Sequence, residues 1–105
     1  MRHSLVIPVL ALTLGLAAAA FASGPEAVEG KALYTAKCQS CHGADGSKAM
    51  MSKPVKGLKE DAVAKAMNGY KAKTYGGAKK ATMENLASRL SDADIKALAA
   101  YISTL

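Results

Sequence analysis

Two cysteines and a histidine lie within five consecutive residues and could together hold a prosthetic group. The segment Cys38-Gln39-Ser40-Cys41-His42 has the spacing C-x-x-C-H. On a helical turn, residues three and four positions apart share one face. Two thiols placed in this way can reach the two vinyl groups along one haem edge while the imidazole reaches the iron. The sequence therefore predicts one covalently bound haem c, attached at Cys38 and Cys41, with His42 as an axial ligand.

Three other uses of these cysteines are less well supported. A disulfide between Cys38 and Cys41 would close so short a loop that it would stabilise the fold only weakly. A thioredoxin-like C-x-x-C needs a preceding strand, whereas the residues before Cys38 predict a helix. A zinc site would need a fourth ligand, and the other histidine of the chain, His3, lies at the far N-terminus. Haem attachment remains the favoured interpretation.

The N-terminal segment predicts export of the protein. A short basic start is followed by an almost wholly apolar run from Leu5 to Ala20, and Ala20-Phe21-Ala22 gives the small-x-small pattern of a signal peptidase site. A membrane anchor is the alternative, but the run is shorter than about 20 residues and is interrupted by Pro8 and Gly15. We expect residues 1–22 to be a cleaved signal peptide and residues 23–105 to form a single domain.

The chain that remains has little apolar bulk for a core. Cleavage after Ala22 leaves 83 of the 105 residues and lowers the net charge from +6 to +5. It also removes the only phenylalanine, Phe21, from a chain without tryptophan. Domains of this size are commonly marginal without a disulfide, a metal or another staple. A buried haem would supply the missing apolar volume.

The hydrophobic pattern predicts an all-α fold of about four helices around the haem, joined by glycine-rich and lysine-rich loops. The last helix has the clearest signals, with Ser91 as its N-cap and apolar residues at helical spacing as far as Leu105. Gly69 is expected to stop the second helix, and Thr82 to cap the third. The expected helices cover residues 26–37, 58–68, 82–90 and 91–105.

The chain resembles the class I cytochromes c, and most closely the small monohaem cytochromes c-553 of sulfate-reducing bacteria. The resemblance covers essentially the whole of residues 23–105, and three segments carry it. These are C-Q-S-C-H-G-A-D-G at residues 38–46, Y-G-G-A-K-K-A-T-M at residues 75–83, and residues 91–105 with their A-x-Y-I ending.

The resemblance implies that the first and last helices pack crosswise, with Gly30 allowing a close approach and Tyr101 filling the contact. It also implies that a methionine sulfur binds the iron opposite His42, and that the Pro54 carbonyl accepts a hydrogen bond from His42 Nδ1. A thioether stabilises ferrous iron and raises the potential relative to a second histidine.

Four methionines remain after cleavage as candidates for this second ligand. Met83 is favoured, because it follows a flexible loop and occupies the position at which the family carries its ligand sulfur. Met67, on the apolar side of the second helix, is the runner-up and is otherwise core filler. Met50 and Met51 follow His42 too closely for the chain to round the haem.

The expected function is that of a periplasmic one-electron carrier rather than an enzyme. The alternative is a peroxidase-type or small-ligand-binding haem protein whose axial methionine is displaceable. The expected partners are electron donor and acceptor proteins with acidic docking surfaces, which would meet a basic face in the loops around the haem. We expect a monomer, with no nucleic-acid partner and no stable membrane insertion after cleavage. The lysines of the expected basic face are Lys48, Lys53, Lys56, Lys71, Lys73, Lys79 and Lys80.

Overall fold

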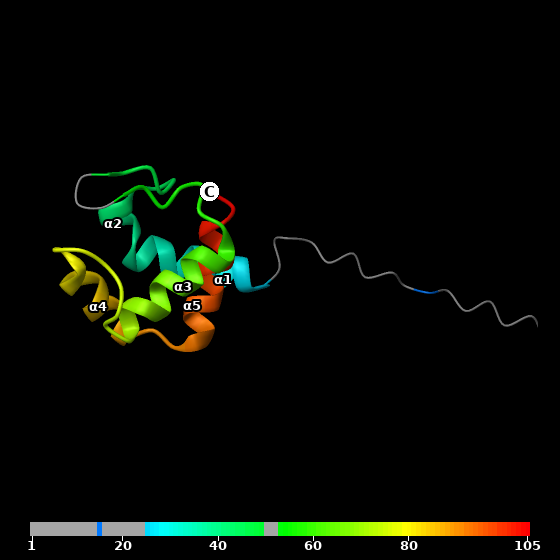
Figure 1. Cartoon of the computed structure of the whole chain (residues 1–105). Helices are drawn as coiled ribbons and strands as arrows, with labels where there is room; N and C mark the ends of the chain where they lie inside the picture. Colours follow the sequence, from blue (N-terminus) through cyan, green and yellow to red (C-terminus); the bar gives the residue numbers. More distant parts are fainter. Residues whose placement is uncertain (1–14, 16–24, 50–52) are drawn as a thin grey trace, which may run out of the picture.

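The structure, a computed structural model, describes residue 15, residues 25–49 and residues 53–105. These residues form helices and loops, which confirms the expected all-α fold (Figure 1). The expected helices are all present, and one further helical turn, α2, carries the C-x-x-C-H segment. The helices are α1 (Pro25–Lys37), α2 (Gln39–His42), α3 (Glu60–Lys71), α4 (Lys80–Ser88) and α5 (Asp92–Ile102).

The predicted signal peptide, residues 1–22, lies outside the described residues except for Gly15. None of the helices in the described part of the chain is long and apolar enough to cross a membrane.

The first and last long helices, α1 and α5, pack directly against each other. A Cβ atom on Gly30 would collide with the Ala97 carbonyl oxygen and would come within 2.8 Å of the Tyr101 Cβ. The Tyr34 and Tyr101 rings meet at the same contact, with their centroids 5.5 Å apart. The expected roles of Gly30 and Tyr101 in this contact are therefore confirmed.

The core is formed by buried side chains of the α1–α5 pair together with side chains of α3 and of the α4 segment. Tyr34, Ile95 and Leu98 are its largest fully buried side chains. α3 contributes Val63 and Met67 to the same cluster. The α4 segment contributes Ala87 and, just after the helix, Leu90. Most of the buried side chains are aliphatic, and Tyr34 is the one buried aromatic residue among those described.

The second expected helix was misplaced at its end. α3 continues through Gly69 to Lys71, so the prediction that Gly69 stops the helix is wrong. Gly69 meets a packing requirement instead, because a Cβ there would lie 2.5 Å from the Tyr75 Cβ. The helix ends at Lys71, with Ala72 as its C-cap, before Lys73 with its positive φ of 62°.

The third expected helix was misplaced at its start, and the fourth at its end. α4 begins at Lys80, where the Lys80 N–H donates to the Gly77 carbonyl at 3.1 Å, so Thr82 lies inside the helix and the prediction of a Thr82 cap is wrong. The Ser91 cap of α5 is confirmed, and Asp94 completes a capping box with it. α5 ends at Ile102 rather than continuing to Leu105.

Candidate functional site

α2 places Cys38, Cys41 and His42 around a single helical turn that follows α1 directly. The Cys38 N–H donates to the Tyr34 carbonyl at 2.9 Å, which continues the hydrogen bonding of α1 into the segment. The Cys38 carbonyl then accepts from the N–H groups of Cys41 and His42, at 3.2 Å and 2.9 Å. The backbone thus has the local geometry on which the C-x-x-C-H prediction rests.

The two thiols are free rather than joined as a disulfide. Cys38 is half-buried, and this burial raises the pKa of its thiol to about 11. A thiol with so high a pKa stays protonated at neutral pH and is a poor redox nucleophile. No cluster of three or more metal-ligating side chains from His, Cys, Asp and Glu occurs in the described ranges.

The His42 imidazole is available as a ligand. Desolvation by burial lowers the pKa of His42, so that the ring is neutral at pH 7, and the neutral ring is the form that binds metal ions. Its Nδ1 atom is buried and has no hydrogen-bond partner among the described residues. The expected hydrogen bond to the Pro54 carbonyl is therefore not formed in this structure, in which Pro54 is exposed.

Gly43, the residue after His42, is hydrogen-bonded to Tyr34 of α1. Gly43 adopts a φ of 86°, in the region that glycine visits without strain. The Tyr34 hydroxyl donates to the Gly43 carbonyl at 2.6 Å. The sequence places Tyr34 within the expected helix of residues 26–37 and says nothing of its hydroxyl. No local pattern indicates a hydroxyl-to-carbonyl bond that spans nine residues.

Met83 lies on α4, in the first turns of the helix, and is partly buried. Its side chain packs against the same core cluster as the Cys38 side chain. In Figure 1, α2 and α4 both lie at the left of the view, with α2 above α4. Met67, by contrast, is 7% exposed and belongs to the cluster itself. Met50 and Met51 lie outside the described residues.

The loop before α4 is fixed by two interlocked tyrosine–glycine contacts. The Tyr70 and Tyr75 rings meet edge to face, with their centroids 5.0 Å apart. A Cβ on Gly76 would lie 2.7 Å from the Tyr70 ring, just as a Cβ on Gly69 would meet Tyr75. The loop that leads to Met83 is thus held against the end of α3.

The lysines of the expected basic face are all exposed, and acidic side chains partly neutralise them. Lys56 pairs with Asp45 at 3.5 Å, and Lys71 pairs with Asp92 at 3.6 Å. The i,i+4 neighbour of Lys80, Glu84, lies 3.6 Å from its Nζ.

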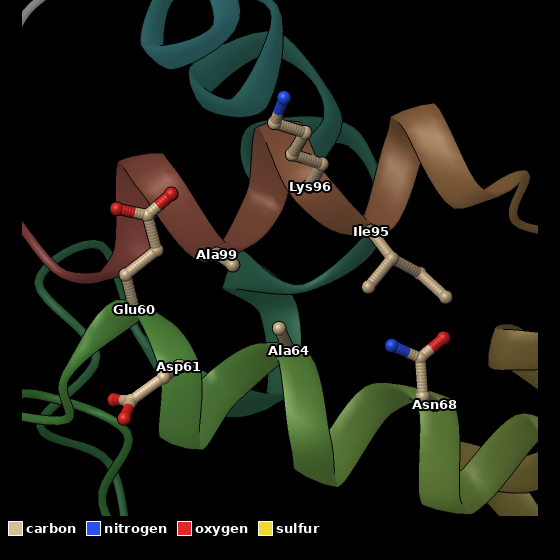
Figure 2. Close-up of a pocket in the computed structure, with 7 residues that line it drawn as sticks. All are labelled: Glu60, Asp61, Ala64, Asn68, Ile95, Lys96 and Ala99. Carbon is tan, nitrogen blue, oxygen red and sulfur yellow. The ribbon is translucent and has the colours of Figure 1, made fainter.

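An open groove between α3 and α5 lies apart from these residues (Figure 2). Figure 2 shows Ala64 and Ala99 facing each other across it, while the Lys96 side chain extends away from α3. The Lys96 Nζ pairs instead with Glu26 of α1 at 3.2 Å. The groove contains none of the predicted site residues. Its lining is Glu60, Asp61, Ala64, Asn68, Ile95, Lys96 and Ala99.

Comparisons with known proteins agree with the resemblance seen in the sequence. The family model described as cytochrome c matches residues 27–105. The chain is 45% identical to cytochrome c-553 of Nitratidesulfovibrio vulgaris over the full length of both chains. It is 52% identical to cytochrome c-553 of Desulfomicrobium norvegicum, over 68% of this chain and 89% of the relative. It is 36% identical to cytochrome c6 of a Picosynechococcus species, over 95% of this chain and 89% of the relative.

Proposed function

The chain belongs to the cytochrome c family, and from this premise we propose that it is a periplasmic one-electron carrier that shuttles between two redox proteins. Its cofactor is one covalently bound haem c, which supplies the one-electron iron couple when bound. Cys38 and Cys41 form the thioethers of this haem. His42 and Met83 are the axial ligands of its iron.

The described residues fit such a group. Two unpaired thiols and a neutral imidazole share one turn, and a buried nitrogen of that imidazole has no partner among the described residues. Met83 of α4 and Cys38, which lies between α1 and α2, are both half-buried and pack against one core cluster. Tyr34 is the single aromatic side chain among the buried residues of that cluster, so the core is small. A haem packed against it would add apolar volume.

Each ligand is held by a separate part of the helical framework. α2 is bonded to the end of α1, so the position of His42 follows that of α1. α4 packs on α3, so the position of Met83 follows that of α3. Because α5 packs on both α1 and α3, it ties the two ligand-bearing halves together. A rigid ligand set changes little between oxidation states, which favours fast electron transfer.

Two observations support export and cleavage before residue 23. The apolar run ends in a peptidase-type site at Ala20-Phe21-Ala22. The family model begins to match at residue 27, and the Desulfomicrobium norvegicum relative aligns over 89% of its own length but over only 68% of this chain. The residues before 27 therefore lie outside the part of the chain that the family model matches.

The observation that carries the proposal is the turn that presents two free thiols and a neutral imidazole. The protein exported to the periplasm should have the mass of the chain from Ser23 onward plus one haem. Acid and organic solvent should leave the haem on the protein, because thioether bonds survive that extraction. Free haem in the organic layer, or a colourless exported protein, would contradict the assignment of Cys38 and Cys41.

A further inference from the structure

The loop of residues 72–79 joins the end of α3 to the start of α4, the helix that carries the proposed sulfur ligand. Backbone hydrogen bonds close each end of this loop locally. The Thr74 N–H donates to the Gly69 carbonyl at 2.9 Å, and the Lys80 N–H donates to the Gly77 carbonyl at 3.1 Å. The first bond lies on the α3 side of the loop and the second on the α4 side, so neither connects the two sides.

Two tyrosine–glycine contacts make this connection. The Tyr75 side chain packs on Gly69 of α3, where an added Cβ would lie 2.5 Å from the Tyr75 Cβ. In the reverse direction, the ring of Tyr70 in α3 packs on Gly76 of the loop, where an added Cβ would lie 2.7 Å from that ring. The two rings meet edge to face, with their centroids 5.0 Å apart. These contacts hold the middle of the loop against the end of α3.

The position of Met83 depends on this loop because Met83 lies in the first turns of α4. One turn farther along the helix, Ala87 is fully buried in the core cluster and anchors the C-terminal half of α4. The helix begins at Lys80, and a Cβ on Gly76 would come within 2.7 Å of the Lys80 Cβ. A movement of the loop away from α3 would therefore move the start of α4, and the partly buried Met83 with it.

The tyrosine–glycine contacts lie at the surface, so they can open without exposing the aliphatic core. The Tyr75 side chain is 47% exposed, whereas the Tyr70 side chain packs against the core cluster. An edge-to-face pair of rings contributes only modestly to the free energy of folding. Release of Tyr75 is therefore a local opening of low cost in comparison with global unfolding.

We propose that Tyr75 is a positioning residue, which holds Met83 in place and thereby limits the access of small external ligands to the iron. This inference rests on the proposed role of Met83 as an axial ligand. While the loop is closed, Met83 keeps its axial position and the protein carries electrons. When the loop opens, that position becomes accessible and the protein can bind a small ligand. The Tyr75 contact therefore shifts the equilibrium toward the electron carrier and away from the ligand-binding haem protein.

The test measures the rate at which imidazole binds to the ferric holoprotein, because imidazole can take the axial position only after the sulfur has left it. Tyr75→Leu removes the ring, and Gly69→Ala displaces it from the opposite side of the same contact. Each variant should bind imidazole about two- to tenfold faster than the wild type, the range set by the contribution of an aromatic pair. Alanine favours a helix more than glycine does, so a faster rate in Gly69→Ala would not come from a weakened α3. Wild-type rates in both variants would overturn the proposal.

Two controls separate this positioning role from a general loss of stability. Gly77→Ala changes the same loop where an added Cβ meets nothing within 4 Å, and its imidazole rate should match that of the wild type. Gly30→Ala disturbs the contact between α1 and α5 instead. It should lower the denaturation midpoint and leave the imidazole rate unchanged. An equal increase of the rate in Gly30→Ala and Tyr75→Leu would assign the effect to global stability and overturn the proposal.

The wild type separates this inference from the proposed function. In the reduced holoprotein, the Tyr75 Hβ protons should show nuclear Overhauser contacts to the Gly69 Hα protons, and their absence would refute the inference even if no variant matures. A ferric wild type without the sulfur-to-iron charge-transfer band contradicts Met83 as a ligand, and with it the premise of the inference. A wild type with this band whose Tyr75→Leu and Gly69→Ala variants bind imidazole no faster contradicts only the role of Tyr75.

Discussion

At the scale of single residues, Met83 and Met67 differ in their surroundings. Met67 is 7% exposed within the core cluster, where its side chain fills volume. Met83 is only partly buried and packs at the margin of that cluster, where the Cys38 side chain also packs. A sulfur that must reach an iron atom has to lie at such a margin, because a side chain enclosed by aliphatic neighbours has no free approach.

Met83→Ala should therefore remove an iron ligand, and Met67→Ala should not. We expect Met83→Ala to lose the weak sulfur-to-iron charge-transfer band of the ferric protein, to lower the potential, and to let the ferrous protein bind carbon monoxide. Met67→Ala should keep the band and lose about 2–5 kcal/mol of stability, the usual range for a buried methionine. Absorption spectra, voltammetry and denaturant unfolding measure these effects. Retention of the band in Met83→Ala with its loss in Met67→Ala would transfer the ligand role to α3.

At this scale, the sequence was sufficient to identify functional residues that lie close together along the chain. The C-x-x-C-H spacing acts within one turn, so the side chains that it groups could be named without knowledge of the fold. The Tyr34 hydroxyl bond depends on where the chain turns after Gly43, and no spacing rule describes that turn. The Pro54 carbonyl was chosen by analogy with the family, and the structure does not place it against Nδ1 of His42.

At the scale of helices, the contact between α1 and α5 depends on the absence of a side chain at Gly30. An added methyl group would collide with the Ala97 carbonyl oxygen, and backbone can move aside only if the two helices separate. Gly30→Ala should therefore destabilise the holoprotein by about 1–3 kcal/mol, as overpacking does. Gly77→Ala is the matched control, because its Cβ would meet nothing within 4 Å. Equal denaturation midpoints for the two variants would contradict the close approach.

The capping box of α5 gives the fold a pH dependence that can be assigned to one carboxylate. The Ser91 backbone N–H donates to Asp94 at 3.0 Å, and the Ser91 hydroxyl accepts from the Asp94 N–H at the same distance. The hydrogen bond from the Ser91 backbone N–H is the main cause that holds the pKa of Asp94 below its usual range. The unfolded chain therefore binds a proton more readily than the folded chain does. The stabilisation is complete above the unfolded pKa of about 4 and is lost as the pH falls through the folded value.

Two variants test this assignment by denaturant unfolding between pH 7 and pH 3. Ser91→Ala should lose about 1 kcal/mol at pH 7, the usual effect of removing a serine N-cap. Asp94→Asn should unfold with less pH dependence than the wild type over the acid part of this range. If Asp94→Asn loses stability on acidification as steeply as the wild type, other carboxylates cause the acid sensitivity.

The errors in the predicted helix ends share one physical cause. Gly69 is a residue type that often ends a helix. Here Tyr75, six residues later, packs against it, so tertiary packing overrides the local signal. Thr82 is a residue type that often caps a helix. The turn from Gly77 to Lys80, however, begins α4 two residues before Thr82. The Ser91 cap was predicted correctly because its partner, Asp94, lies within the same turn. Helix ends were therefore predicted correctly where the residues that form them lie within one turn of each other.

At the scale of the whole molecule, the distribution of charge determines which partners can approach. The chain carries a net charge of +6, and the seven lysines of the expected basic face lie in or next to the loops that precede α3 and α4. Ion pairs with Asp45, Asp92 and Glu84 offset three of them. Lys73 and Lys79 lie on either side of Tyr75 in the loop before α4. Neither forms an ion pair with an acidic residue in the described part of the chain. They leave two positive charges without an acidic partner in the loop that precedes α4.

Reversing these two charges should weaken the attraction of an anionic redox partner. Hexacyanoferrate(III) is a suitable probe for the ferrous protein, since its negative charge resembles that of an acidic docking surface. We expect its second-order rate constant to fall with rising ionic strength, because salt screens charges beyond about 10 Å at 0.1 M. Lys73→Glu with Lys79→Glu should reduce the rate about tenfold at low salt and flatten the salt dependence, in line with the size of electrostatic steering.

The control has the same net charge with the substitutions placed elsewhere. Lys31→Glu with Lys65→Glu changes two exposed lysines of α1 and α3 outside these loops. A local docking face predicts a much smaller effect for this control, because the added charges lie away from the loop that leads to Met83. Equal slowing by the two double variants would mean that the total charge of the molecule attracts the probe. In that case the lysine-rich loops would promote solubility without directing partners to the haem.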